Sequence, residues 1–186
     1  LHDDLVKSLS KEDDLVQGLT LSQPNLLSYI SAAGVCVWMD GQMTQHGQTP
    51  TVEQTRGLVQ WLNNTVSEGV FCTDGLPLVY EPARAFRGTA SGILALSVSR
   101  TPKDYVIWFR PEIVETVRWA GRPEKELTES ESGMRLSPRK SFAAWEERMQ
   151  LRSEPWSNVD IQTAHALRVS LLEVVLQRID QIAREK

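Results

Sequence analysis

Short apolar runs that are rich in β-branched and aromatic residues constrain the fold of this chain more than any other feature of its sequence. The clearest read GVCVWM at 34–39, ASGILALSVS at 90–99 and DYVIWFR at 104–110, and a shorter one reads GVFCTDG at 69–75. Each run has the length of a strand and is bounded by Gly, Pro or polar residues, which is typical of β-structure. The runs therefore predict a sheet.

The first of these runs continues into a turn signal. Asp40-Gly41 supplies the positive φ angles of a tight hairpin turn, and the sequence QMTQHG follows it. We therefore predict strand, turn and strand within residues 32–47.

Helix signals alternate with the predicted strands. Residues 51–54 have the form of a capping box, and Leu58, Leu62 and Val66 then recur at helical spacing, which predicts an amphipathic helix to about residue 67. Further helix signals precede the first strand, in residues 5–19 and from Pro24.

The last segment, residues 157–186, is the clearest helix, because neither Gly nor Pro interrupts it and Ser157 or Asn158 is placed to cap it. It carries two apolar stripes, of which one is Ala164, Leu167, Leu171 and Val174, and the other is Leu172, Val175, Ile179 and Ile182. One stripe suffices for packing on a sheet, so two indicate a second partner helix, such as the same helix of another copy in a homodimer. The alternative is that both stripes belong to the core.

The order of these elements is helix, hairpin, helix, strand, loop, strand, strand and a long final helix. Such an order is typical of the α+β class, in which helices pack on a mostly antiparallel sheet.

Composition excludes several classes of function. The chain has 186 residues, a mass of 21.0 kDa and a net charge of −4 without a basic stripe, so we expect one domain and no nucleic-acid partner. No apolar run approaches the roughly 20 residues of a membrane span, so we expect no membrane partner. Cys36 and Cys72 form no CxxC unit, which favours buried, reduced thiols in a cytoplasmic protein. The chain begins with Leu1, which suggests a piece of a longer protein.

Residues 111–156 differ in character from the rest of the chain. Arg and Glu are densely interspersed there, yet the segment also holds the large aromatics Trp119, Phe142, Trp145 and Trp156. A structureless insertion of this length is uncommon in a compact domain and usually indicates function or disorder. The aromatic residues argue against simple disorder.

Three stretches together resemble the PHY domain of a bacterial phytochrome: residues 90–123, SPRKSFAAWEERM at 137–149, and residues 152–178. The resemblance covers essentially the whole chain. Its most specific part is a Pro-Arg-x-Ser-Phe element followed by a Trp-x-Glu element, formed by Pro138, Arg139, Ser141, Phe142, Trp145 and Glu147. Trp119-Ala120-Gly121 departs from the family's Trp-Gly-Gly by one residue, which puts the local turn geometry in question.

The resemblance implies a GAF-like α+β fold with a central antiparallel sheet flanked by helices. It implies a single domain over 1–186, with a long hairpin called the tongue inserted at 110–156 and a connector helix at 157–186. It also implies a signalling module of a red/far-red photoreceptor, in which upstream PAS and GAF domains of the same polypeptide carry the bilin chromophore, biliverdin. The output domain would follow Lys186, and Cys36 and Cys72 match no attachment motif, so the bilin would be attached outside this segment.

By the same resemblance, the tongue contacts the GAF domain and its chromophore pocket and exchanges between strand and helix on photoconversion. In a strand Arg139 and Ser141 share a face while Phe142 and Trp145 lie on opposite faces, and in a helix both relationships reverse. The resemblance implies that Arg139 binds a GAF-domain Asp in the strand form and that Ser141 approaches that site in the helical form. The alternative is that Arg139 is a solvated surface charge.

Helix and strand signals compete within this segment. Ser137 can cap a helix, Pro138 fits its first position, and Phe142, Trp145 and Met149 would share one face. The Ser-Pro dipeptide and the β-rich arm PEIVETVRW at 111–119 favour strands instead. Separated from the GAF domain, the tongue is expected to be partly disordered or held in one form by neighbouring copies.

The predicted site residues fall into three groups. The tongue contacts are Pro138, Arg139, Ser141, Phe142, Trp145 and Glu147; the hairpin anchors are Trp119, Gly121 and Trp156; the dimer residues of the connector helix are Leu167, Leu171 and Val174. No catalytic or metal-binding motif is present, and His165 lacks the flanking residues of a kinase phosphoacceptor helix, so we expect no enzyme and no metal. Two alternatives are a GAF-like small-ligand sensor and a passive dimerising connector.

Overall fold

The structure is a computed structural model of the whole chain, and it describes residues 26–39, 41–66, 69–98, 104–114, 117 and 138–185. The expected helices within residues 5–19 lie outside the described residues. So do Trp119 and Gly121, which were predicted as hairpin anchors.

A five-stranded antiparallel sheet forms the centre of the fold, as predicted, with the strand order β2-β1-β5-β4-β3. The strands are β1 Gly34–Met39, β2 Gln42–Gly47, β3 Val70–Thr73, β4 Gly92–Ser97 and β5 Tyr105–Arg110. The helices are α3 Leu26–Tyr29, α4 Val52–Thr65, α5 Leu76–Val79, the 3-10 helix η1 Glu81–Phe86, α7 Pro138–Met149 and α8 Asn158–Glu185. The chain therefore has the α+β architecture that its sequence indicates.

The hairpin of β1 and β2 forms where the sequence places it. Met39 pairs with Gln42, and Gly41 in the turn has a φ of 75°, a value that glycine adopts without steric cost.

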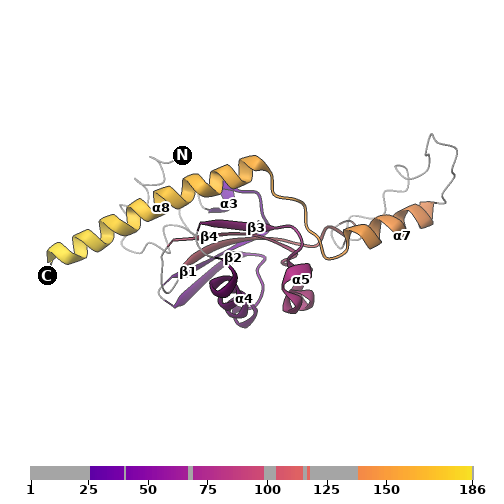
Figure 1. Cartoon of the computed structure of the whole chain (residues 1–186), viewed down its shortest axis with the longest axis horizontal. Helices are drawn as coiled ribbons and strands as arrows, with labels where there is room; N and C mark the ends of the chain where they lie inside the picture. Colours follow the sequence, from indigo (N-terminus) through magenta and orange to yellow (C-terminus); the bar gives the residue numbers. More distant parts are fainter. Residues whose placement is uncertain are drawn as a thin grey trace.

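Both faces of the sheet are covered by helices (Figure 1). Along β5, Val106 and Trp108 point to the face covered by α3 and α8, whereas Tyr105, Ile107 and Phe109 point to the face covered by α4, α5 and η1. A sheet buried on both faces needs apolar residues on both, which explains why the central strands are continuously apolar rather than alternating with polar residues.

Helix α4 begins at the predicted capping box. The Thr51 hydroxyl accepts a hydrogen bond from the Gln54 N–H at 3.2 Å, and the Gln54 side chain accepts one from the Thr51 N–H at 3.0 Å. Leu58 and Leu62 are buried against the sheet, as their spacing predicts. The helix ends at Thr65, slightly before the predicted residue 67.

One prediction for the connecting segments is wrong. The segment after β3, expected as a loop, contains α5 and η1, each with a proline in its first turn. The arm after β5 carries strand signals within a segment for which strand and helix both stayed open, and its described residues Ile113, Val114 and Val117 are helical. Local β-propensity therefore did not decide the conformation of these residues.

The two cysteines lie on opposite faces of the sheet. Cys36 is fully buried among the residues that face α4, and Cys72 is half-buried against the face that α8 covers, so the two thiols are free. Burial raises the pKa of Cys36 to about 12, and burial together with the nearby charge of Asp74 raises the pKa of Cys72. Both thiols are therefore protonated at neutral pH.

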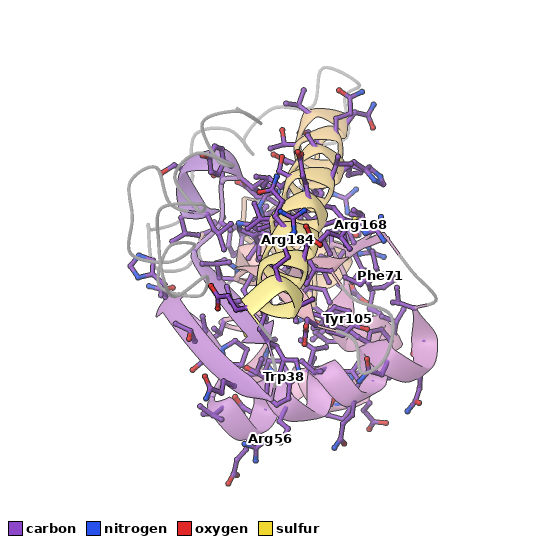
Figure 2. The ribbon with its side chains drawn as sticks, turned by 90° about the vertical axis from the view of Figure 1, so that its left-hand side faces the viewer. Trp38, Arg56, Phe71, Tyr105, Arg168 and Arg184 are labelled. Carbon is purple, nitrogen blue, oxygen red and sulfur yellow. The ribbon has the colours of Figure 1, made fainter. Side chains whose placement is uncertain are left out.

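Helix α8 lies across the sheet on the face opposite α4 (Figure 2). Ala164, Leu167, Leu171 and Val174 are buried in the core beneath it. This stripe, which includes the three residues predicted for a dimer contact, packs on the sheet of its own chain. A contact with a second copy stays a prediction. It would have to use the other side of the helix, where Leu172 and Val175 are half-buried and Val169 and Leu176 are exposed.

We expect Leu171→Ala to lower the free energy of unfolding by about 2–5 kcal/mol, because it removes a fully buried side chain and leaves a cavity between α8 and the sheet. The matched control is Leu176→Ala on the exposed side of the same helix, which should change stability by less than about 0.5 kcal/mol. Urea unfolding followed by circular dichroism measures both, and equal losses would contradict this assignment of the two faces.

Candidate functional site

The candidate site is the base of the segment that was predicted to be the tongue insertion, where the chain leaves the sheet at the end of β5 and returns to it before α8. We call residues 110–114 the outgoing arm and residues 150–156 the returning arm. Beyond these arms, α7 extends away from the sheet, on the side opposite the C-terminal end of α8 (Figure 1). The base is therefore the connection between the insertion and the domain.

Arg110, the last residue of β5, joins three segments at this base. Its guanidinium donates to the Ser31 carbonyl through Nε at 2.9 Å and through Nη2 at 2.8 Å. It also donates to the Pro155 carbonyl at 2.8 Å and to the Asp160 carboxylate at 3.3 Å. One side chain, only 11% exposed, thus fixes the segment before β1, the returning arm and the first turn of α8.

Asp160 also takes part in the hydrogen bonds that cap α8. Its carboxylate accepts a hydrogen bond from the Ser157 N–H at 2.9 Å, while the Ser157 hydroxyl accepts one from the Asp160 N–H at 3.1 Å, so the two residues cap α8 reciprocally. Burial acts to raise the pKa of Asp160, but the hydrogen bonds from Ser157 and the charge of Arg110 outweigh it and hold the pKa below its usual value. The carboxylate is therefore ionised at neutral pH.

Trp156 lies at the end of the returning arm and meets both the sheet and Arg110. Its Nε1–H donates to the Thr73 carbonyl at the end of β3 at 3.1 Å, and its ring lies 3.8 Å from the Arg110 guanidinium carbon. This is the stacking that a planar guanidinium makes with an aromatic face. The role of Trp156 as an anchor of the insertion stays a prediction, and these are the contacts through which it would act.

The returning arm is also held on β3 and β4 through its backbone. The Ser153 N–H donates to the Asp74 carbonyl at 2.8 Å, and the Arg152 guanidinium lies 3.5 Å from the Asp74 carboxylate. The Ser153 hydroxyl occupies the position that a Cβ atom at residue 92 would take, so the arm can approach β4 this closely only because that residue is Gly92.

The outgoing and returning arms are bonded to each other. Glu112 is 4% exposed, and its carboxylate accepts a hydrogen bond from the Leu151 N–H at 2.7 Å. The Ile113 N–H donates to the Arg152 carbonyl at 2.8 Å, and Arg87 lies 3.7 Å from the Glu112 carboxylate. Charge-assisted and backbone hydrogen bonds therefore hold the two arms together at the base.

Helix α7 contains the predicted tongue contacts. Pro138 and Arg139 lie in its first turn, and the structure describes their backbone only. Phe142 is 4% exposed and Trp145 is half-buried, with ring centroids 5.5 Å apart and planes inclined by 37°. Ser141 is half-buried and Glu147 is exposed. The described form of this segment is therefore the helical alternative, in which Phe142 and Trp145 share a face.

The sequence reasoning did not single out Arg110, Glu112, Leu151 or Asp160. For Asp160 a signal existed, because Ser157-Asn158-Val159-Asp160 has the spacing of a capping box with Asp as the fourth residue. For Arg110 and Glu112 the only signal is a charged residue directly after a strongly apolar strand, which does not identify the partner.

Two shallow hollows lie on the described surface. One of about 230 Å³ lies beside Arg110 and is lined by Ser31, Ala32, Ala33, Arg110, Pro111, Ile113 and Glu154, and one of about 470 Å³ lies between the start of α4 and η1. Among the described residues, no three His, Cys, Asp or Glu side chains gather to hold a metal ion. Within the same part of the chain, no helix has the length and apolarity that crossing a membrane requires.

The described residues form an α+β domain with a five-stranded antiparallel sheet and a long C-terminal helix, and comparison with known proteins gives the family. The model of the phytochrome region, PHY, matches residues 1–180, so the chain belongs to the PHY family, as its motifs indicate.

Among curated relatives, the chain is 40% identical over 185 residues to cyanobacterial phytochrome B of Nostoc sp., covering 99% of this chain and 25% of that protein. It is 33% identical over 180 residues to the bacteriophytochrome of Pseudomonas aeruginosa, covering 97% of this chain and 24% of that protein. It thus spans about a quarter of the length of these relatives.

Solved structures give the same assignment. The photosensory core module of Stigmatella aurantiaca phytochrome superposes with a TM-score of 0.70 at 37% identity, covering 95% of this chain and 35% of that one. A bacteriophytochrome from R. palustris superposes with a TM-score of 0.67 at 26% identity, again covering 95% of this chain and 35% of that one. Both structures therefore agree with the assignment of this chain to the PHY family.

We expect Asp160→Asn to lower the free energy of unfolding by about 1 kcal/mol at pH 7, because it weakens charge-assisted hydrogen bonds at the start of α8. Since the pKa of Asp160 is lowered in the folded state, its contribution is complete above the unfolded pKa of about 3.9 and is lost as the pH falls below that value.

Urea unfolding of the two proteins between pH 7 and pH 3 should therefore give curves that converge in acid. The control is Asp180→Asn, which changes an exposed carboxylate on the same helix and should be nearly neutral throughout. A difference between wild type and Asp160→Asn that does not depend on pH would contradict the assigned cause.

Proposed function

We propose that this PHY domain is the signalling module of a red/far-red bilin photoreceptor. In this proposal the tongue contacts a GAF domain of the same polypeptide, stabilises one photostate, and relays strand-to-helix refolding through α8 to an output domain that follows Lys186. The role is one of signal transfer in the cytoplasm, without catalysis in this domain.

The observation that carries the proposal is the junction at Arg110. A change in the returning arm cannot leave Arg110 unaffected, because Arg110 donates to the Pro155 carbonyl and stacks on Trp156. It cannot leave α8 unaffected either, because the same guanidinium binds Asp160 in the first turn of that helix. Two discrete arrangements of such a network are what allosteric transfer requires.

The tongue itself would supply the two arrangements. Helix α7 places Phe142 and Trp145 on one face, and refolding to a strand would move them to opposite faces. By its match to the family motif, Arg139 would then bind a carboxylate of the GAF domain in the strand form, while Ser141 would take that place in the helical form. An arginine suits this role because its fork binds a carboxylate in two places and keeps its charge when buried.

The bilin belongs to the GAF domain in this proposal, because this chain's cysteines do not fit an attachment site. Cys36 is fully buried beneath α4 with a strongly raised pKa, and Cys72 is half-buried against the core under α8, with a pKa raised by burial and by Asp74. Neither thiol therefore forms a thiolate readily. This chain's contribution to the chromophore would therefore be the tongue that covers its pocket.

The test of the switching role uses the chain joined to its native upstream PAS and GAF domains and loaded with biliverdin. We expect amide-region infrared difference spectra to show a light-driven strand-to-helix band change, and Arg139→Ala to reduce it because the strand form loses its ion pair. Arg148→Ala is the control, because it removes an exposed arginine of the same helix that is not among the predicted contacts, and it should have a smaller effect. If wild type photoconverts without such a band, the domain is a passive dimerising connector.

The relay through Arg110 predicts a separate phenotype. Arg110→Lys keeps the charge but cannot donate at once to Ser31, Pro155 and Asp160, so it should leave the absorption spectra of both photostates intact while reducing the light-induced movement of α8 by roughly half or more. Spin labels near Glu185 report this movement as a change in distance between the two copies of a dimer.

The matched control for this variant is Arg168→Lys. Arg168 also ties α8 to the sheet, by donating to the Ser97 carbonyl at 2.8 Å, but it contacts neither arm of the tongue in the described structure. Equal loss of movement in the two variants would show that Arg110 only stabilises the position of α8.

A further inference from the structure

We propose that Leu151 sets the balance between the two tongue conformations, because its left-handed backbone destabilises the helical form relative to the strand form. This inference rests on the strand-to-helix exchange of the proposed function, and it names the residue that tunes that exchange.

The backbone conformation of Leu151 is the starting observation. Leu151 has a φ of 64°, and it is the one non-glycine residue with positive φ in the described part of the chain. It follows Met149 and Gln150, where α7 ends, in the place where many helices carry a glycine. A leucine there brings its Cβ too close to the backbone, which makes the conformation several-fold less favourable than it is for glycine.

Hydrogen bonds on both sides confine the turn to this residue. Before it, the Gln150 N–H makes the last helical bond of α7, to the Glu146 carbonyl at 2.8 Å. After it, the Arg152 carbonyl accepts from Ile113 and the Ser153 N–H donates to Asp74, so the rest of the arm is fixed on the domain. The boundary between α7 and the part of the arm that is bonded to the domain therefore falls on Leu151.

The buried carboxylate of Glu112 holds the strained turn in place. It accepts the hydrogen bond of the Leu151 N–H at 2.7 Å, which a charged acceptor makes stronger than a neutral one. The helical form thus combines a steric cost at Leu151 with a compensating bond from the outgoing arm. In an extended tongue, residue 151 would have negative φ, and the steric cost would disappear.

This arrangement predicts opposite effects for substitutions at one position. Leu151→Gly relieves the left-handed turn and weakens a strand, so both effects favour the helical tongue. Leu151→Val does the reverse, because a β-branched side chain opposes positive φ and favours strands. Leu151→Ala keeps the Cβ and loses the rest of the side chain, so it is the matched control for lost packing.

The experiment uses the chain with its native PAS and GAF domains and biliverdin. Infrared difference spectra of wild type first identify which photostate has the helical tongue, and the thermal decay of that state is then timed for each variant. We expect Leu151→Gly to slow this decay about fivefold, Leu151→Ala to change it less than about twofold, and Leu151→Val to accelerate it. Leu151→Asn, which tolerates left-handed backbone, should slow it as well and replaces the glycine variant if that fails to fold.

The outcomes separate this inference from the function on which it rests. If wild type shows the strand-to-helix band but the glycine and alanine variants shift the decay equally in one direction, Leu151 acts through its side-chain contacts and the inference is overturned while the proposed function stands. If wild type photoconverts without the band, both are overturned. Only the order glycine, alanine, valine from slowest to fastest decay supports a backbone effect.

Discussion

A single charged group at the end of an apolar strand organises the connection between the tongue and the rest of this domain. Arg110 follows five residues of β5 that are buried on both faces of the sheet, and its guanidinium finds acceptors on three separate segments. A charge in such a position is tolerated only when its donors are satisfied, because removing it from water without partners costs several kcal/mol. The start of α8 and the returning arm must therefore both be in place for β5 to end as it does.

The sheet provides the rigid reference for that junction. Its central strands are covered on one side by α8 and α3 and on the other by α4, so they cannot shift without exposing a core. Trp108 illustrates the coupling between layers, because it is fully buried within β5 and its Nε1–H donates to the Leu26 carbonyl of α3 at 3.1 Å. In the proposed relay, a change at the base would therefore act on the segments that are held by a few polar bonds rather than by packing.

The elements that the sequence predicted well are those whose pattern is local. The capping box at Thr51, the turn at Gly41 and the uninterrupted helical sequence of α8 each carry their own signal over a few turns or residues. The polar contacts at the base of the two arms were not predictable in the same way. Arg110 and Glu112 find their partners about 40 to 80 residues away in sequence, at backbone groups whose positions depend on the completed fold.

The segment of α7 could be predicted only in part, for a different reason. Its sequence holds competing signals for helix and strand, and the structure describes the helix, so the sequence predicted the alternatives without deciding between them. The outgoing arm, with its β-rich composition, is helical at Ile113 and Val114, because the bond from Ile113 to Arg152 and the burial of Val114 outweigh local propensity. A segment suited to two conformations is expected to give such mixed signals.

The length of α8 gives the junction a mechanical consequence. Val174 is the last described residue of the helix that is buried in the core, and the helix continues to Glu185, which adds about 16 Å beyond Val174. In the proposed relay, a segment of that length would act as a lever that pivots near Val174. A change of about 10° in the direction of the helix would move its far end by about 3 Å, enough to alter how side chains interlock with a neighbouring helix.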